Sequence, residues 1–369
     1  MDQATTALAP NILIAPLDWG LGHATRCIPI IRCLLQKNCN VFIAGEGKTR
    51  TLLQAEFPHL HFVDLKGYRI TYSRSKMALP FAIAAQIPKL LATIQYENER
   101  VKDIVKEHNI HGLISDNRYG FYHMSIPSVF LTHQLRIKTG LGSSADDFLQ
   151  KLNYRYISHF AQCWVPDNPG DANLAGELSH PAKKPSVPTK YLGVLSRFLH
   201  TFEQQKHLLI LISGPEPQRT IFEKLMVKQV QEYKGSIVLV RGLPNEAGAL
   251  QLSPNVAVFN HLPSAELNRE MSEASLIISR CGYSTVMDLA VLKKKSILVP
   301  TPGQAEQEYL AKHLMQRNFA LCIPQQKFRL EQALDLSANF NYQLDAFTPE
   351  DHLDSAIDQF ISMVRKGNQ

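Results

Sequence analysis

The sequence predicts an α/β fold made of two doubly wound, Rossmann-like domains that face one another across a cleft. Three observations predict it. The chain has 369 residues, more than one hydrophobic core usually organises. Short runs that are apolar at every position recur, as strands covered on both faces of a parallel sheet require. Segments with helical periodicity separate most of these runs, and the whole pattern occurs twice.

The expected strands fall into two series. The first series is 11–17, 40–45, 112–116 and 128–133. A polar, Pro-rich stretch at 181–190 suits a surface loop near the end of the first domain. The second series is 208–212, 236–241, 256–259, 275–279 and 296–300. We therefore place the domains at 1–197 and 198–369, with a last helix at about 349–366 expected to pack back on the first domain.

Composition narrows the classes of function. The net charge is +6, but no stretch concentrates it as a nucleic-acid-binding arm would. The six cysteines form no C-x-x-C pair, which favours a reducing, cytoplasmic location. No signal peptide is evident, and no run approaches the ~20 apolar residues of a membrane helix. An apolar segment at 77–91, preceded by basic residues, can lie on the inner face of an anionic membrane; an ordinary core helix is the alternative.

In open α/β sheets, ligands lie beyond the carboxyl ends of the strands, so the loops that follow the strands carry the chemistry. The loop after the first strand contains Gly20 and Gly22, which allow close backbone approach, and His23, which can exchange a proton near neutral pH. A tight turn with an exposed histidine is the alternative interpretation. The third glycine of the dinucleotide fingerprint is missing, so a nicotinamide oxidoreductase is poorly supported.

Three loops of the second half offer groups for a phosphorylated sugar. Ser213 and Gly214 precede a helix whose N-terminus can bind an anion, unless the loop is only a Pro-stiffened turn. The densest group is Gly282, Ser284 and Thr285, whose backbone N–H groups suit a diphosphate, with Asp288 one turn further along. Asp288 alone would be an ordinary acid on a helix face. In the last of the three loops, Gln304, Glu306 and Gln307 suit a polyol, or else a solvated helix N-terminus.

The segment from Arg280 to Asp288, followed by Gln304 to Gln307, resembles the family 28 glycosyltransferases, and the similarity is clearest over 191–320. This resemblance implies the two-domain GT-B fold and a UDP-sugar co-substrate, without a metal or other cofactor. It assigns Gly282, Ser284 and Thr285 to the diphosphate together with Ser213, Gly214 and Arg197. It further assigns Leu262 and Asp288 to the nucleoside, and Gln304, Glu306 and Gln307 to the sugar.

The resemblance implies inverting transfer to an acceptor hydroxyl, such as that of a lipid-linked or cell-envelope glycan. The first half departs from the family pattern, with His133 where a carboxylate is expected, so the acceptor stays open. Three residues that follow apolar strands are candidate bases, His23 first, then Asp116 and His133. Asp116 could instead cap a following helix, and His133 could be a satisfied buried histidine.

Two other functions remain compatible with the sequence. A UDP-GlcNAc epimerase of the same fold would share the donor site and need no acceptor. A sugar-nucleotide-binding subunit without turnover would depend on a partner chain, although both halves are present here. The transferred sugar and the oligomeric state are left open by the sequence.

Overall fold

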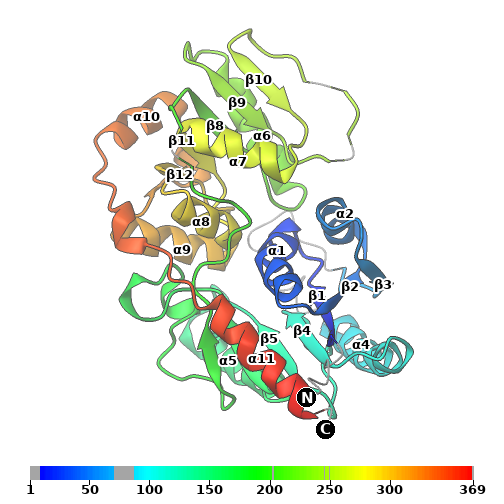
Figure 1. Ribbon diagram of the computed structural model, residues 1–369. Coiled ribbons are helices and arrows are strands. Elements are labelled where there is room, and N and C mark those ends of the chain that lie inside the picture. Colours follow the sequence, from blue (N-terminus) through cyan, green and yellow to red (C-terminus); the bar gives the residue numbers. More distant parts are fainter. Residues whose placement is uncertain (1–8, 70–86, 202, 245, 249, 368–369) are drawn as a thin grey trace.

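The computed structural model describes residues 9–69, 87–201, 203–244, 246–248 and 250–367. It contains two parallel β-sheets, each with helices on its faces, and so confirms the predicted α/β fold. Figure 1 shows the second sheet above the first, with α1 between them. In the described part of the chain, no helix is both long and apolar enough to cross a membrane.

The first sheet has the strand order β3-β2-β1-β4-β5-β6-β7. Its strands are β1 (Asn11–Pro16), β2 (Asn40–Gly45), β3 (His61–Asp64), β4 (Gly112–Asp116), β5 (Ser128–Leu131), β6 (Gln162–Val165) and β7 (Thr189–Tyr191). Its helices are α1 (Leu21–Gln36), α2 (Gly47–Glu56), α4 (Ile87–Glu107) and α5 (Ser143–Ile157). The connections from β1 and β4 leave the sheet on opposite sides, which opens a crevice at their carboxyl ends.

The second sheet has the order β10-β9-β8-β11-β12-β13, with its crevice between β8 and β11. Its strands are β8 (His207–Leu211), β9 (Ile237–Val240), β10 (Val256–Phe259), β11 (Ala274–Ser279), β12 (Ser296–Leu298) and β13 (Leu321–Cys322). The helices that follow are α6 (Gln218–Val230), α7 (Ser264–Glu273), α8 (Tyr283–Val291), α9 (Ala305–Gln316), α10 (Leu330–Ala338) and α11 (Leu353–Gly367).

All nine expected strands are present, with ends that differ by at most two residues. Four further strands, β3, β6, β7 and β13, were not predicted. β3, β7 and β13 lie at sheet edges, where only one neighbour covers the strand, so their residues need not be apolar throughout. β7 is half-buried along its whole length, and β13 has only two residues. The interior strand β6 begins with a glutamine, which interrupts the apolar signal.

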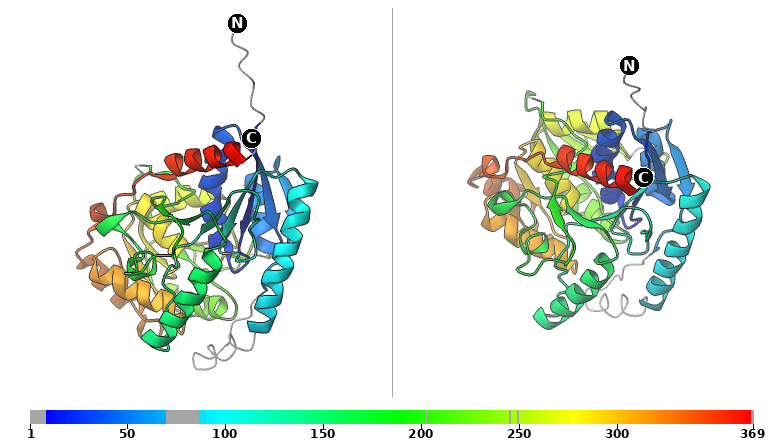
Figure 2. Two further views of the ribbon diagram at one scale, coloured as in Figure 1. Left: turned by 90° about the horizontal axis from the view of Figure 1, so that it is seen from below. Right: turned by 60° about the horizontal axis from the view of Figure 1, so that its bottom comes forward.

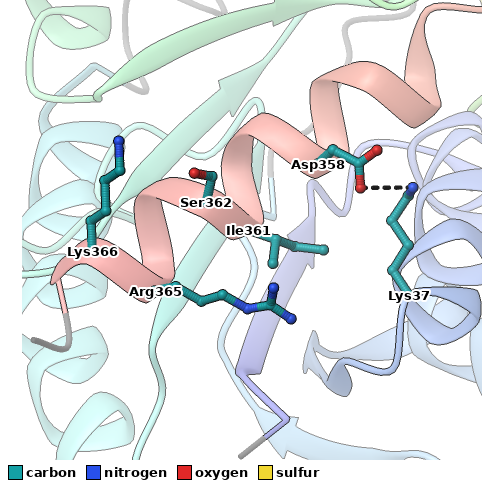
Figure 3. A pocket seen from close by; sticks show the side chains of 6 residues that line it. All are labelled: Lys37, Asp358, Ile361, Ser362, Arg365 and Lys366. Atoms are coloured by element: carbon teal, nitrogen blue, oxygen red, sulfur yellow. Dashed lines mark ion pairs between the residues drawn. The ribbon is translucent and has the colours of Figure 1, made fainter. Parts of the chain in front are cut away.

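The C-terminal helix α11 lies across the first sheet, although it follows the second one in sequence (Figure 2). Its Phe360 ring packs edge-on against Trp164 of β6 at 5.7 Å. A Cβ added at Gly112 of β4 would lie 2.7 Å from Cζ of Phe360, so a glycine lets the helix approach the strand. Nζ of Lys37, next to α1, lies 2.7 Å from the Asp358 carboxylate at one end of a shallow surface pocket (Figure 3).

Candidate active site

A cleft of about 1800 Å³ lies between the two domains at the carboxyl ends of both sheets. Since the crevices of the two sheets face it, loops that are far apart in sequence meet there. Of the sixteen predicted site residues, fifteen line this cleft and only Asp116 does not. The fifteen are Gly20, Gly22, His23, His133, Arg197, Ser213, Gly214, Leu262, Gly282, Ser284, Thr285, Asp288, Gln304, Glu306 and Gln307.

His23 and Asp116 form a pair at the crevice of the first sheet. His23 lies in the first turn of α1, and Asp116 is the last residue of β4 and fully buried. Nδ1 of His23 lies 3.1 Å from Oδ2 of Asp116. In the described part of the chain, Nε2 of His23 has no hydrogen-bond partner. Asp116 therefore lies behind the imidazole, and its proposed role as a helix cap is wrong because no helix begins between β4 and β5.

Arg26 lies one turn after His23 on α1 and contacts both members of this pair. Its Nε donates to Oδ1 and Oδ2 of Asp116 at 3.1 and 3.0 Å, and its Nη2 lies 2.8 Å from Nδ1 of His23. Nη1 lies 3.1 Å from Nδ1 of His133. Arg26 is 2% exposed, so its charge is balanced by Asp116 within the protein. Arg26 was not among the predicted site residues, although its spacing of three from His23 places both on one helix face.

Burial and neighbouring charges set the protonation of the pair. Burial lowers the pKa of His23 below its ordinary value of 6.5, and although Asp116 opposes this shift, Arg26 adds to it. Burial alone would raise the pKa of Asp116, but Arg26 and His23 outweigh it and hold that pKa below its usual range. At neutral pH the site thus holds a neutral imidazole beside a carboxylate.

His133 contacts the second domain rather than open solvent. Its Nε2 lies 2.8 Å from Oε1 of Glu306, at the start of α9, and Gln134 donates to the other carboxylate oxygen. The His133 ring stacks on Tyr283 with centroids 4.2 Å apart. Burial lowers the pKa of His133, which makes the pair with Glu306 a hydrogen bond from a neutral ring. Both ring nitrogens are therefore engaged, and Glu306 joins the two domains.

The N-terminus of α8 faces the glycine loop of the first domain. In the described residues no side chain caps this helix, so its first N–H groups point to the cleft with the positive end of the helix dipole. Oγ of Ser284 donates to the carbonyl of Gly22 at 3.0 Å. A Cβ at Gly22 would lie 2.5 Å from that Oγ. The close approach of α1 and α8 therefore depends on the absence of a side chain at Gly22.

We expect Gly22→Ala to push the domains apart at this point, because the added methyl group overlaps Ser284. The free energy of unfolding should fall by about one to three kcal/mol, as is typical of overpacking. Urea unfolding measures the change. The double variant Gly22→Ala/Ser284→Gly should recover most of the stability, and equal urea midpoints for the wild type and Gly22→Ala would contradict the overlap.

A second network lies at the other side of α8. Oγ of Ser196 donates to Oδ1 of Asp288 at 2.6 Å, and Nη1 of Arg197 donates to Oγ of Ser264 at 3.1 Å. Nε of Arg197 is buried and has no partner among the described residues. Burial raises the pKa of Asp288 to about 6, against the effects of Arg197 and Ser196. An unpartnered donor and a carboxylate thus lie side by side in the cleft.

Other predicted site residues of the second domain hold their loops in shape. Gly214 has a φ of 110°, a left-handed conformation that side chains disfavour. Oε1 of Gln307 accepts from the backbone N–H of Thr301 at 2.9 Å, and its Nε2 donates to Oε1 of Gln304. Gln307 therefore orders the loop after β12 and orients Gln304.

Comparison with known proteins relates the second half of the chain to a glycosyltransferase family and both halves to a known fold. Residues 221–358 match the glycosyltransferase family 28 C-terminal domain. A UDP-N-acetylglucosamine--N-acetylmuramyl-(pentapeptide) pyrophosphoryl-undecaprenol N-acetylglucosamine transferase of Methylorubrum extorquens is 37% identical over 83 residues, 22% of this chain and 20% of that protein. The enzyme of the same name from Rhodopseudomonas palustris is 22% identical over 197 residues, 51% of this chain and 53% of that protein.

The chain therefore spans between about a fifth and about a half of the length of these curated relatives. Among solved structures, the spinosyn rhamnosyltransferase SpnG has a TM-score of 0.66 at 13% identity, covering 95% of this chain and 100% of that chain. This likeness extends over both domains and shows a shared two-domain GT-B fold. The resemblance predicted from the sequence is confirmed.

Proposed function

From the match of residues 221–358 to the glycosyltransferase family 28 C-terminal domain, we propose that this chain transfers a hexosyl or N-acetylhexosaminyl group from a UDP-sugar to an acceptor hydroxyl, with inversion. One observation carries the proposal: the unpartnered Nε2 of His23 and the uncapped N-terminus of α8 line the same cleft. A proton acceptor thus faces a site for a departing diphosphate.

In the proposed reaction, Nε2 of His23 takes the proton of the acceptor hydroxyl while the acceptor oxygen attacks the anomeric carbon. The bond from that carbon to the UDP oxygen breaks, and UDP leaves with the electron pair. A single displacement inverts the anomeric centre. In the tautomer that reacts, Nδ1 carries a hydrogen that it donates to Oδ2 of Asp116, 3.1 Å away, so Nη2 of Arg26 does not donate to Nδ1 in that state. Asp116 is thus a positioning residue that stabilises the imidazolium as it forms.

Charge that develops on the departing UDP needs fixed positive dipoles. The N–H groups of Gly282, Ser284 and Thr285 supply them, and each preorganised donor contributes about 3 to 4 kcal/mol in sites of this kind. Arg197, with its unpartnered Nε, adds a cation. In this proposal the reaction at the diphosphate uses no metal ion. The names of the curated relatives favour UDP-N-acetylglucosamine as the donor.

Apolar side chains on one wall of the cleft suit an amphiphilic acceptor. Leu141 and Phe148 line the cleft, yet their side chains are 65% and 67% exposed, and Leu91 of α4 continues the wall. Lys138 lies at the same wall, where its Nζ pairs with the exposed Glu177 at 2.7 Å, a partner that an anionic head group would have to displace. We propose a lipid-linked acceptor on these grounds. Most of the segment expected to contact a membrane, 77–91, lies outside the described residues, so peripheral membrane contact stays a prediction.

The donor assignment is tested by unfolding the protein in the presence of UDP-, GDP- and dTDP-sugars, because a ligand of the folded state raises its Tm. We expect stabilisation by UDP-sugars, and release of UDP once a polyprenyl-linked acceptor is added. Stabilisation only by GDP- or dTDP-sugars would overturn the donor assignment. An epimer formed from UDP-GlcNAc alone would identify an epimerase, and binding without any turnover would identify a binding subunit.

The pH dependence of kcat/KM should have an acid limb set by His23. The base works only when it is neutral, and its lowered pKa keeps it neutral at about pH 7 to 8. We therefore expect a constant rate over that range and a loss of activity as the pH falls through the lowered pKa, below 6.5. Steady-state rates at each pH measure this, with thermal unfolding at the same pH as the control. A rate that rises toward acid would contradict a neutral base.

Phe148→Ser should raise KM for a lipid-linked acceptor without affecting donor binding. The side chain is exposed, so the fold does not depend on it, and the lost apolar contact is worth about 1 to 3 kcal/mol, or roughly 5- to 150-fold in affinity. Leu336→Ser, at an exposed leucine outside the cleft, is the matched control. An unchanged KM for the acceptor would show that this apolar wall does not bind the acceptor.

A further inference from the structure

Three metal-ligating side chains meet at the amino end of the second sheet, away from the cleft. His207 is the first residue of β8, and Glu270 and Glu273 lie in the last turn of α7, three residues apart on one helix face. One ligand atom from each of the three lies within 4.8 Å of the others. The cleft is formed at the carboxyl ends of the same strands, so this cluster is separate from the proposed active site.

The imidazole of His207 is the buried group of the cluster that needs a partner. His207 is 6% exposed, and its Nε2 is buried without a hydrogen-bond partner among the described residues. Oε2 of Glu270 lies 3.4 Å from Nε2. Buried polar atoms normally have partners, so this nitrogen calls for one.

The two carboxylates are held in place from the solvent side. Nη2 of Arg269 lies 3.3 Å from Oε1 of Glu270, while Oε2 of the same carboxylate faces the imidazole. Nζ of Lys206 lies 2.8 Å from Oε1 of Glu273. The Arg269 and Lys206 side chains are 62% and 52% exposed, so either can swing into solvent when another cation binds. One oxygen of each carboxylate and the imidazole nitrogen thus lie close enough together to bind a single cation.

We propose that His207, Glu270 and Glu273 form a zinc-binding site, with Nε2 of His207 and one oxygen of each glutamate as ligands and water in the fourth position. One nitrogen and two carboxylate oxygens form a ligand set that Zn²⁺ accepts, with bonds of about 2.0 to 2.2 Å. Such bonds in a tetrahedron put neighbouring ligand atoms about 3.3 to 3.6 Å apart. The 3.4 Å between Nε2 of His207 and Oε2 of Glu270 already matches this spacing.

The site would join the start of β8 to the end of α7. Without the ion, these elements are connected here by the hydrogen bond from the Lys206 N–H to the Glu273 carbonyl and by the exposed ion pair of Lys206 with Glu273. Zn²⁺ would displace Nζ of Lys206 and give His207 the partner it lacks. Because metal bound only by the folded state adds its binding energy to folding, the second domain would become more resistant to heat.

The test uses the full chain after treatment with a chelator and dialysis. Titration with ZnCl₂ in a calorimeter should show one saturable equivalent, and excess Zn²⁺ should raise the Tm. Co²⁺ in place of Zn²⁺ should give the visible spectrum of a tetrahedral nitrogen and oxygen site without a thiolate charge-transfer band, which excludes binding at the cysteines. These readouts are independent of glycosyl transfer, so loss of the proposed activity would leave them unchanged.

Two variants decide the assignment. His207→Ala and Glu273→Gln should each abolish the saturable equivalent and the rise in Tm. Glu273 is partly exposed, so its variant keeps the proposal testable if His207→Ala fails to fold. His352→Ala, which removes an exposed histidine 2.9 Å from Glu350, is the matched control and should bind Zn²⁺ as the wild type does. Wild-type binding in Glu273→Gln, or no saturable binding by the wild type, would overturn the site.

Discussion

His23→Ala should lower the rate of sugar transfer by about 10²- to 10⁴-fold, the usual contribution of a general base. The variant keeps the diphosphate site at α8, so the rise in Tm on adding UDP should be the same as in the wild type. The measurement is UDP release and product formation at saturating donor and acceptor. His352→Ala is the control for removing a histidine outside the cleft.

A double variant tests whether His23 is the base and Asp116 only orients it. Asp116→Asn should also lower the rate, because Nδ1 of His23 loses its charged partner 3.1 Å away. If Asp116 acts only through His23, the variant His23→Ala/Asp116→Asn should be no slower than His23→Ala alone. Wild-type transfer by His23→Ala would end its assignment as the base. His133 would then be the remaining candidate, and it would require the His133–Glu306 contact to open.

Arg26→Met should destabilise the first domain by about 3 to 5 kcal/mol, because it leaves the buried Asp116 carboxylate without its cation. The loss should appear as a lower urea midpoint of unfolding. Arg32→Met is the matched control on the same helix: Arg32 also pairs with a carboxylate, that of Glu56, but it is 43% exposed. Exposed pairs contribute at most about 1 kcal/mol, so the control should unfold close to the wild type.

The same substitution tests how Arg26 acts on His23. Arg26 lowers the pKa of His23, so removing its charge should raise that pKa and move the acid limb of kcat/KM to higher pH. Arg26→Met/Asp116→Asn removes both buried charges and should recover part of the lost stability. A structural role alone would lower stability but leave the acid limb in place. Equal urea midpoints for Arg26→Met and Arg32→Met would contradict the buried pair.

The positions of the main strands and of the loops that line the cleft followed from the sequence alone. Parallel strands covered on both faces must be apolar throughout, and ligand-binding loops follow their carboxyl ends, so both signals are local. Gly282 to Asp288 and Gln304 to Gln307 could therefore be predicted to line the cleft, while their assignment to the sugar donor came from the family resemblance. Strands at the sheet edges were not predicted because a partly exposed strand need not be apolar at every position.

Only the tertiary structure decided which side chains meet. The strand order brings β1 beside β4, which puts Asp116 behind His23 with Arg26 between them, although 93 residues separate the pair. Domain packing brings Glu306 to His133 across 173 residues, so a residue assigned to the sugar also joins the domains. His207 meets Glu270 in the same way, because the end of α7 packs against the start of β8. Periodicity reports which face of an element is buried, but it holds no information on which distant element covers that face.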